Sequence, residues 1–489
     1  MKHLFIGIGI SQKDNLIEAG KEAAEKAKKE LTEELKKEEK EYPEGKQASY
    51  GAGKSPILLM FFCTYTYPKE QYEKAQKQVQ DVFEAEKQIP PIPLIGGTTL
   101  GFFAKDRYYF DPALMGKPAE IALKTAGKIF KPLKFTGAVV LALQSDYINV
   151  GTGIGLNAFE KPYEAGRTSI EMAGKSLLFN PQLAYMAMLK RGVKDISKIR
   201  PVNGFIITPG SDKQARFHDS QILEGVTSIS KTALRIQGGG LTGGMSKFAT
   251  LPGFAFYNGK VYQEAVISVI LGSELEIGYG VGVGIKPIAN IGLITKIKDP
   301  WTIEEINGKP AVEVISKVYK EHTNLNVEKW LKTSKDWLTP IIIGYPAAVP
   351  ESSGNFFWPM LHGVENKYLR TATPVKEGIT LVLGQIAKES CKQATSKATQ
   401  LMIEDIDSKN FGFVLFFSCA ARGMILGKDY MVEIKKIKET LENKDIPVFG
   451  IASSGEQAFY KTGSPTGTAV TITMLGISNE SIFISKEAR

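Results

Sequence analysis

The chain has 489 residues, which exceeds the roughly 250–300 residues at which a single hydrophobic core stops growing. We therefore expect two or three domains or repeats. Hydrophobic residues make up 43% of the chain and aromatic residues 10%, so an intrinsically disordered protein is excluded. The net charge is +9, but the lysines alternate with glutamates instead of clustering with arginines and aromatic residues. We therefore expect no nucleic-acid partner.

The cysteines and the apolar runs bear on the cellular compartment. The chain has three cysteines, Cys63, Cys391 and Cys419, and this small odd number argues for a reducing compartment without a disulfide framework. No apolar run approaches the roughly 18 residues of a transmembrane helix. The first residues form at most a short apolar segment without a cleavage site of small residues. We expect a cytoplasmic protein with no membrane span.

Three blocks of similar pattern follow one another along the chain. Each has a short apolar strand, a helix, and a second strand that runs into glycines and small polar residues. The separation between a strand phenylalanine and a turn glycine is nearly constant, which indicates an internal repeat. The pairs are Phe61 and Gly96, 35 residues apart; Phe205 and Gly238, 33 apart; and Phe416 and Gly450, 34 apart.

Each block also has an upstream strand and helix and a closing strand. The upstream segment at 5–31 resembles the one at 149–177, and we place the third copy at 379–402. The fold class is therefore α+β, with three quasi-repeats of strand, helix, strand, helix, strand, strand. We expect mixed sheets with helices on their outer faces. The inner faces must be buried too, either in a sandwich or about a pseudo-threefold axis, and both arrangements stay open.

We divide the chain into an N-terminal part at 1–300 and a C-terminal part at 301–489. The first part holds two repeats, and the second holds an insert followed by the third repeat. An aromatic stretch at 340–363 lies within the insert, and it either lines a site or covers a neighbouring subunit. The expected bounds are 1–146 and 147–276 for the two repeats, 301–377 for the insert and 378–489 for the third repeat.

Two glycine motifs and the histidines are weak indications of cofactors. GAGKS at 51–55 resembles the end of a phosphate-binding loop, but it lacks the first glycine and precedes a strand. GYGVGVG at 278–284 lacks the spacing of a dinucleotide-binding turn, so we interpret its glycines as marks of a bulged or bent strand. The four histidines have no partner at metal-ligand spacing, so we expect no metal site. His362 is the candidate axial ligand if haem binds.

The turns at 96–101, 238–244 and 450–456 are the best candidates for a binding site. They combine backbone amides with hydroxyl groups and, in the third turn, a carboxylate. Such groups suit a small polar molecule, although tight turns between strands are the alternative interpretation. Cys419 and Arg422 follow a strand, and an arginine lowers the pKa of a nearby thiol. Cys419 is therefore a core residue, a residue that lines a ligand, or a nucleophile.

Two stretches of the N-terminal part follow a known succession of motifs. PLIGGTTLGFF at 93–103 looks like a motif of glycine and small residues that ends in Gly-Glu, with Phe102 in place of the glutamate. Residues 258–297 show a strand and a glycine-rich strand that leads into Pro-Ile. INGKPAVEVI follows at 306–315 and is similar to a Gly-Lys-Pro-Ala motif.

Two stretches of the C-terminal part continue this succession. VLFFSCAARG at 414–423 and IPVFGIASSGEQAF at 446–459 look like F-S-C-x-x-R and I-x-G-x-x-x-x-G-E signatures, which Arg422 and Glu456 match. In their order and spacing, these motifs resemble those of the FIST-domain family over roughly residues 1–480. The resemblance implies a small-molecule sensor domain of signal transduction. Amino acids have been proposed as ligands of this family, and some members look haem-binding.

From this resemblance we predict a sensor that binds a small polar ligand, possibly an amino acid, and signals through a separate partner protein. The ligand would lie in a cleft where the glycine-rich turns converge. Arg422 would pair with its carboxylate, because a guanidinium suits bidentate pairing, and Glu456 would meet its amine. The other predicted ligand-binding residues are Ser453, Ser454, Cys419, Gly96, Gly97, Thr98, Thr99 and Gly239.

Three alternatives stay open at the level of sequence. Arg422 and Glu456 could form a mutual salt bridge that braces the last repeat. The protein could be a haem-based gas sensor with His362 as ligand. It could also be a hydrolytic enzyme that uses the hydroxyl and thiol groups of the turns, such as Ser453 or Cys419. The sequence offers no general base for that reaction.

Overall fold

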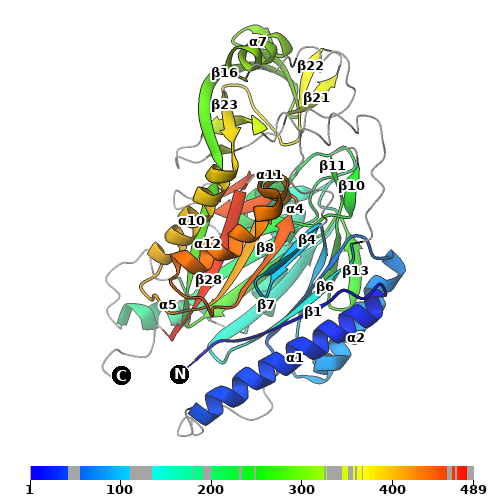
Figure 1. Cartoon of the computed structure of the whole chain (residues 1–489), viewed down its shortest axis with the longest axis vertical. Helices are drawn as coiled ribbons and strands as arrows, with labels where there is room; N and C mark the ends of the chain where they lie inside the picture. The colour runs from blue at the N-terminus through cyan, green and yellow to red at the C-terminus, as the bar shows by residue number, and fades with distance from the viewer. Residues whose placement is uncertain are drawn as a thin grey trace.

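The computed structural model describes most of the chain and confirms the α+β class. Four mixed or antiparallel sheets of six or more strands and their helices form the molecule (Figure 1). None of the helices in the described part combines the length and hydrophobicity needed to cross a bilayer. The described residues are 2–41, 55–110, 135–178, 180–190, 200–230, 234–246, 249–323, 327, 344–350, 356–357, 361–365, 367–459, 465–468 and 471–481.

Three of the sheets have six strands in an equivalent order. In each sheet the first strand pairs with the closing strand, and the two middle strands run parallel. The first sheet is β1 (Phe5–Ser11), β6 (Ala138–Gln144), β2 (Leu58–Thr64), β3 (Leu94–Thr99), β12 (Phe254–Tyr257) and β13 (Lys260–Gln263); the second is β7 (Ile148–Gly155), β14 (Val266–Ser273), β8 (Val202–Thr208), β9 (Arg235–Gly240), β26 (Glu456–Phe459) and β27 (Pro465–Thr468); the third is β15 (Leu275–Val283), β28 (Thr471–Ser481), β24 (Phe411–Cys419), β25 (Val448–Ser453), β4 (Gly101–Ala104) and β5 (Arg107–Phe110).

The last two strands of each sheet come from a different part of the chain. The hairpin β4–β5 follows β3 of the first sheet but pairs with β25 of the third. The hairpin β26–β27 follows β25 but pairs with β9 of the second sheet. The hairpin β12–β13 follows β9 but pairs with β3 of the first sheet. The three sheets therefore exchange hairpins in a closed cycle.

The constant separation between phenylalanine and glycine follows from the two parallel middle strands. Phe61 lies opposite Gly96, and Phe416 lies opposite Gly450, each pair in register across neighbouring strands. In the second sheet Phe205 lies opposite Gln237, one residue before Gly238. The helix between the two strands fixes this separation, because a parallel pair needs a crossover connection.

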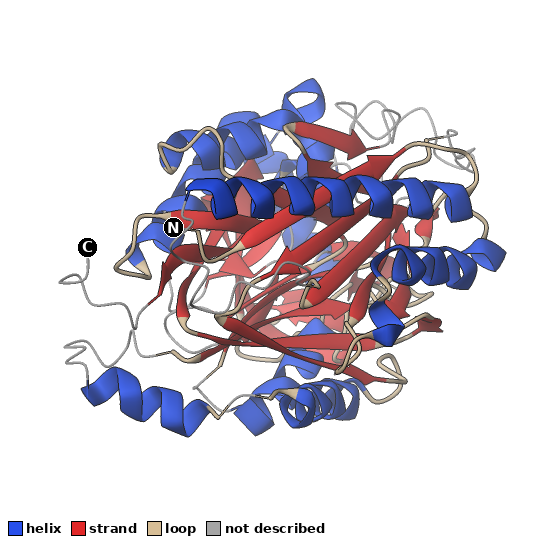
Figure 2. Ribbon diagram, turned by 90° about the horizontal axis from the view of Figure 1, so that it is seen from below, coloured by secondary structure: helices blue, strands red, loops and turns tan. Residues whose placement is uncertain are grey.

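Helices cover the outer face of each of these three sheets, while the inner faces pack on one another (Figure 2). The inner faces share one hydrophobic core that includes Met60, Phe205 and Leu415, one residue from each sheet. Separate hydrophobic clusters lie between each sheet and its helices. The covering helices are α1 (Leu16–Glu41) and α2 (Tyr72–Phe83); α4 (Pro162–Ser176) and α6 (Asp219–Ser230); α10 (Lys388–Glu404) and α12 (Val432–Thr440).

Alternating glycines in the first strand of each sheet let a helix pack against the strand backbone. A Cβ at Gly9 would lie 1.8 Å from the Ala23 carbonyl oxygen of α1, and one at Gly280 would lie 1.8 Å from that of Ala398 in α10. The interpretation of GYGVGVG as a bulged or bent strand is therefore wrong for Gly280 and Gly282, which lie in a regular stretch of β15 and make room for α10. The register irregularity of β15 comes before them, between Leu275 and Ile277.

The strand expected to open the third repeat belongs to a fourth sheet. Residues 380–386 form β23, which pairs with β16 (Ile285–Asp299), whereas β15 occupies the place of β1 and β7. The placement of the third copy at 379–402 was wrong at its strand, because the chain leaves the third sheet after β15 and returns only at α10. The fourth sheet also contains β17 (Thr302–Ile306), β18 (Lys309–Pro310), β19 (Ala347–Pro350), β20 (Phe356–Phe357), β21 (Leu361–Glu365) and β22 (Tyr368–Thr371), with α7 (Ala311–Thr323) beside it.

Candidate functional site

Hydrogen bonds join the three glycine-rich turns. The Thr242 amide of the second turn donates to the Thr98 carbonyl of the first, at 3.0 Å. The Thr99 hydroxyl of the first turn donates to the Ala452 carbonyl of the third, at 2.7 Å. The Ser454 amide donates to the Gly240 carbonyl, at 2.8 Å, and joins the third turn to the second. The three turns therefore converge, although they lie far apart in the sequence.

The glycines and threonines of the first turn are used in contacts between strands. A Cβ at Gly96 would lie 1.8 Å from the Phe61 carbonyl oxygen, and one at Gly97 would lie 2.4 Å from that of Phe254. The Thr98 hydroxyl accepts the Phe254 amide at 3.0 Å. These contacts hold the turn in place. They agree with the alternative interpretation of the turns as tight connections between strands.

Gly239 has a similar role where the second and third turns meet. Its Cα lies opposite Glu456 in the pairing of β9 with β26. A Cβ there would lie 2.7 Å from the Cβ of Ser453 and 2.7 Å from the Phe417 ring. Only glycine lets these strands approach so closely.

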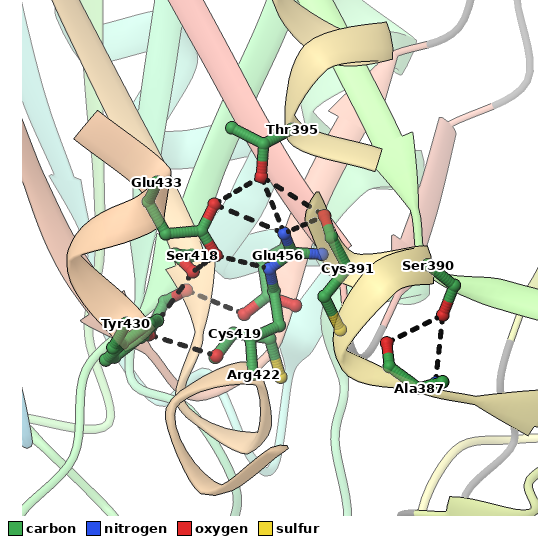
Figure 3. Close-up of polar contacts among 11 residues, drawn as sticks. Ala387, Ser390, Cys391, Thr395, Ser418, Cys419, Arg422, Tyr430, Glu433 and Glu456 are labelled. Carbon is green, nitrogen blue, oxygen red and sulfur yellow. Dashed lines mark hydrogen bonds and ion pairs between the residues drawn. The ribbon is translucent and has the colours of Figure 1, made fainter. Parts of the chain in front are cut away.

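Arg422 lies at the centre of a buried polar network outside the third sheet (Figure 3). It sits on α11 (Ala420–Leu426), directly after β24, and its Nε donates to Glu433 Oε1 of α12 at 2.8 Å. Its Nη2 donates to the Cys391 carbonyl and to the Thr395 hydroxyl, both at 2.8 Å. Burial alone would lower the pKa of Arg422, but the ion pair with Glu433 outweighs it and raises the pKa. The guanidinium is therefore charged and bound to a carboxylate of its own chain.

Tyr430 and Ser418 extend this network on the side of Glu433. The Ser418 hydroxyl donates to Glu433 Oε1 at 3.3 Å, and the Tyr430 hydroxyl donates to Ser418 at 3.2 Å. All three side chains are buried, and burial raises the pKa of Tyr430. A tyrosine that stays protonated serves here as a hydrogen-bond donor.

Glu456 reaches the same network from the third turn. The Ser453 hydroxyl donates to Glu456 Oε1 at 2.6 Å, and both side chains are fully buried. Burial raises the pKa of Glu456, although Ser453, Cys419, Thr471 and Arg422 each favour its ionised form. The structure thus brings together four of the predicted site residues: Arg422, Glu456, Ser453 and Cys419.

Ser454 faces away from this network, toward the second sheet. Its hydroxyl donates to the Thr250 hydroxyl at 2.7 Å, and the Ser211 and Thr250 hydroxyls also lie 2.7 Å apart. Ser453 is the last residue of β25 and Ser454 lies in the bend that follows, so the two adjacent serines belong to different clusters. Ser453 serves the Arg422 network, whereas Ser454 serves a junction with the second repeat.

Asp219 and Gln457 form the core of this junction. We call these two residues, together with Thr208, the turn junction. Asp219 begins α6 and is 4% exposed, and Gln457 is fully buried. Gln457 Nε2 donates to the Thr208 hydroxyl at 3.2 Å, and both Thr208 and Gln457 also hydrogen-bond to Asp219. Among the described residues, Asp219 Oδ1 and Gln457 Oε1 have no hydrogen-bond partner. Burial raises the pKa of Asp219 to about 7, although Thr208, His218 and Gln457 favour its ionised form.

The loop before α6 is held by a second ionic cluster. Asp212 Oδ2 accepts from Arg216 Nε at 2.8 Å and lies 3.3 Å from His218 Nε2. Burial alone would raise the pKa of Asp212, but hydrogen bonds from His218 and Arg216 outweigh it and lower the pKa to about 2. The His218 ring packs edge-on against Trp301, which follows β16 of the fourth sheet. This cluster positions Asp219 and ties the second repeat to the fourth sheet.

Sequence reasoning missed Glu433, Asp219, Gln457 and Asp212. A usable signal was present, because Gly-Ser-Asp at 210–212 follows β8 as Ala-Ala-Arg at 420–422 follows β24. The side chain of His362 lies outside those that the structure describes. In the described part, no group of three or more His, Cys, Asp or Glu side chains could hold a metal ion.

Comparison with known families gives two matches along this chain. The model of the FIST N domain matches residues 57–309, and the model of the FIST C domain matches residues 314–459. No curated protein sequence matches the chain. The first family match ends just after β17, and the second ends with β26, so together they include all three converging turns.

Proposed function

The chain belongs to the FIST family, whose domains are sensory domains of signal transduction, and we propose that it senses a small polar molecule at the turn junction. A single observation carries this proposal. Asp219 Oδ1 and Gln457 Oε1 are buried acceptors without a hydrogen-bond partner among the described residues. A buried acceptor without a partner costs about 1–3 kcal/mol, and a ligand that donates hydrogen bonds would recover this energy.

A ligand that fits two buried acceptors on contacting side chains carries donors, and an ammonium group with three N–H donors is the best match. An ionised Asp219 would add charge to these hydrogen bonds and strengthen them. Asp219 thereby takes the role that the sequence suggested for Glu456. Arg422 already binds Glu433, so we propose that Arg422, Glu456, Ser453 and Cys419 hold the third turn in place for the ligand.

The remaining parts of the functional hypothesis stay proposals. Ser454 precedes Gly455, where a Cβ would lie 2.8 Å from Asp219 Oδ2, so Ser454 would border the ligand. Gly239 pairs with Glu456, the neighbour of Gln457, and would border the ligand from the second turn. A separate signalling protein would read the bound state. The three cysteines are buried and form no disulfide, which supports a reducing, cytoplasmic setting. The haem-sensor and hydrolase alternatives gain no supporting contact from the described residues.

Thermal-shift and calorimetric measurements with a panel of amino acids, primary amines and carboxylic acids test the proposal. At pH 8, where Asp219 is mostly ionised, we expect an amine-bearing compound to stabilise the wild-type chain. Asp219→Asn should weaken this binding by roughly 10-fold or more, because a charge-assisted hydrogen bond becomes a neutral one. The affinity of the wild type should rise with pH through about 7.

The matched control is Asp81→Asn, which removes a carboxylate that is 53% exposed on α2. This variant should bind the same compound as the wild type does. A ligand that binds Asp219→Asn and wild type equally would place the site elsewhere. Stabilisation by carboxylic acids alone would contradict the proposed ligand class.

A further inference from the structure

Two arginines share one carboxylate between the second and third repeats. Asp405 directly follows α10, and its side chain is 4% exposed. It accepts from Arg200 Nη1 at 2.7 Å and from Arg235 Nη1 at 2.6 Å. Arg200 Nη2 also donates to the Asp405 carbonyl oxygen, at 2.5 Å. We call these three residues the arginine cluster.

The charges of the arginine cluster do not balance. The side chains of Arg200 and Arg235 are only 10% and 19% exposed. Among the described residues, Asp405 is the only carboxylate that forms an ion pair with either of them. Burial and the charge of Arg200 lower the pKa of Arg235, although Asp405 favours its charged form. One positive charge is therefore left without a counterion in a site that is mostly removed from water, which is unfavourable.

Arg200 also keeps a donor that no acceptor uses. Its Nε is buried and has no hydrogen-bond partner among the described residues. A buried donor without a partner destabilises the folded state until an acceptor reaches it. A guanidinium presents five N–H donors in one plane, and this fork matches the oxygens of a carboxylate or a phosphate.

The other two repeats show that this position does not require two arginines. In the first strand of each of the three sheets, the residue between two glycines donates its backbone amide to a side chain at or near the end of the helix that covers that sheet. These pairs are Ile8 and Glu30 at 2.9 Å, Thr152 and Ser176 at 2.9 Å, and Tyr279 and Asp405 at 3.0 Å. Glu30 pairs with a single cation, Lys105, and Ser176 carries no charge. An acceptor for the strand amide is therefore sufficient, and the second arginine beside Asp405 is left to be explained.

We propose that Arg200 and Arg235 bind a small oxyanion, the phosphate or carboxylate group of a small molecule. One negative charge would balance the cluster, and an oxygen acceptor would satisfy the Arg200 Nε. Arg235 is the more exposed of the two arginines, so the anion would enter beside it.

This site is separate from the turn junction. Arg200 precedes the first residue of β8, whereas Thr208 of the turn junction is the last residue of that strand. A strand of seven residues spans roughly 20 Å. An anion at the arginine cluster and an amine at the turn junction would therefore occupy opposite ends of the second sheet.

Titration of the full chain with inorganic phosphate or with acetate tests the proposal, by thermal unfolding and calorimetry at constant ionic strength. Phosphate stabilises proteins in general at high concentration, so the titrations stay in the low millimolar range. At least one of the two anions should stabilise the wild type in a saturable manner, and the comparison shows which group the site prefers. Arg235→Gln should weaken this binding by roughly 10-fold or more, because it removes a charged donor.

The matched control is Lys105→Gln, which removes the cation at the equivalent place in the first repeat. Lys105 lies 3.0 Å from Glu30 and is 46% exposed. This variant should bind the anion as the wild type does. Arg235→Lys keeps the charge but loses the planar fork, so its affinity should lie between those of the wild type and Arg235→Gln. It also carries the test if Arg235→Gln does not fold.

Three results would overturn the proposal. The first is a wild type that neither anion stabilises in a saturable manner. The second is equal binding by Arg235→Gln and the wild type. The third is an equal loss of binding in Lys105→Gln, because a general loss of positive charge would then explain the effect. A failure to bind amines at the turn junction would not affect this test, since its probes are anions and its variants lie at the other end of β8.

Discussion

Two buried polar clusters lie on opposite sides of the same turn and differ in how their groups are paired. On one side, Arg422 donates to Glu433, Thr395 and a backbone carbonyl within the chain. On the other side, Asp219 and Gln457 each keep an acceptor oxygen without a partner among the described residues. The hydrogen bonds of the first cluster join parts of the chain to one another, whereas two acceptors of the second cluster have no partner among the described residues.

The comparison distinguishes two kinds of buried polar group, those that are paired and those that are not. A charge that is paired and hydrogen-bonded stabilises a unique arrangement only as long as its partners stay, since breaking one partner leaves the other uncompensated. A buried acceptor without a partner instead destabilises the folded state, and a ligand that donates a hydrogen bond to it removes this cost. We therefore assign architecture to the Arg422 network and recognition to the turn junction. The following variants test that assignment.

Arg422→Met should have the largest effect on stability. It leaves Glu433 charged and buried, so we expect a loss of about 3–5 kcal/mol in the free energy of unfolding, measured by urea denaturation. Lys436→Met breaks an exposed pair with Glu439 and should cost less than about 1 kcal/mol.

The double variant Arg422→Met, Glu433→Met sharpens this test. It removes both buried charges, so it should recover much of the stability that the single variant loses. A double variant as unstable as Arg422→Met would mean that packing, and not the uncompensated charge, causes the loss.

Asp219→Asn should change the pH dependence of stability. Folding raises the pKa of Asp219 from 3.8 to about 7, so its protonated form stabilises the native state fully below pH ~4. This contribution is lost as pH rises through about 7. The variant should therefore gain stability relative to the wild type between pH 5 and 7, by at most about 1.4 kcal/mol per pH unit. Urea unfolding at several pH values measures this, and a difference that does not vary with pH would contradict it.

Variants of the adjacent serines should have the smallest effects on the free energy of unfolding, and they compare the two clusters directly. Ser453→Ala removes a 2.6 Å hydrogen bond to buried Glu456 and should cost about 1–3 kcal/mol. Ser454→Ala removes a bond to another hydroxyl and should cost about 0.5–1.5 kcal/mol. Only Ser454→Ala should also alter ligand binding. Equal effects of the two variants on both measurements would erase the distinction between the clusters.

The fold class was accessible from the sequence, but the connections were not. Apolar periodicity and the regular separation of Phe61 and Gly96 reflect local crossovers, which a sequence records directly. The strand at 380–386 was assigned to the third repeat because it also precedes a helix. Only its pairing with β16 shows that it belongs to the fourth sheet. Exchange of hairpins joins residues more than 150 positions apart, and no local pattern encodes such pairing.

The candidate site was predictable to a similar degree. The turns were recognised by their glycines, and their convergence follows from the equivalent sheets. The partner of Arg422 was not predictable, because Glu433 lies on a separate, lysine-rich helix where a glutamate suggests a solvated surface. Asp219 was missed because the sequence of α6 does not tell which polar residue is buried.

The closed cycle of hairpins also determines which strands a fragment of the chain would leave without a partner. A fragment that ends near residue 310 would keep β9 but lose β26–β27, so its second sheet would present a bare strand to solvent. A fragment that starts there would lose β15 together with β4–β5. Exposed strands of this kind invite aggregation. We therefore expect that neither matched domain folds alone and that the smallest unit that folds is the entire ring of three sheets.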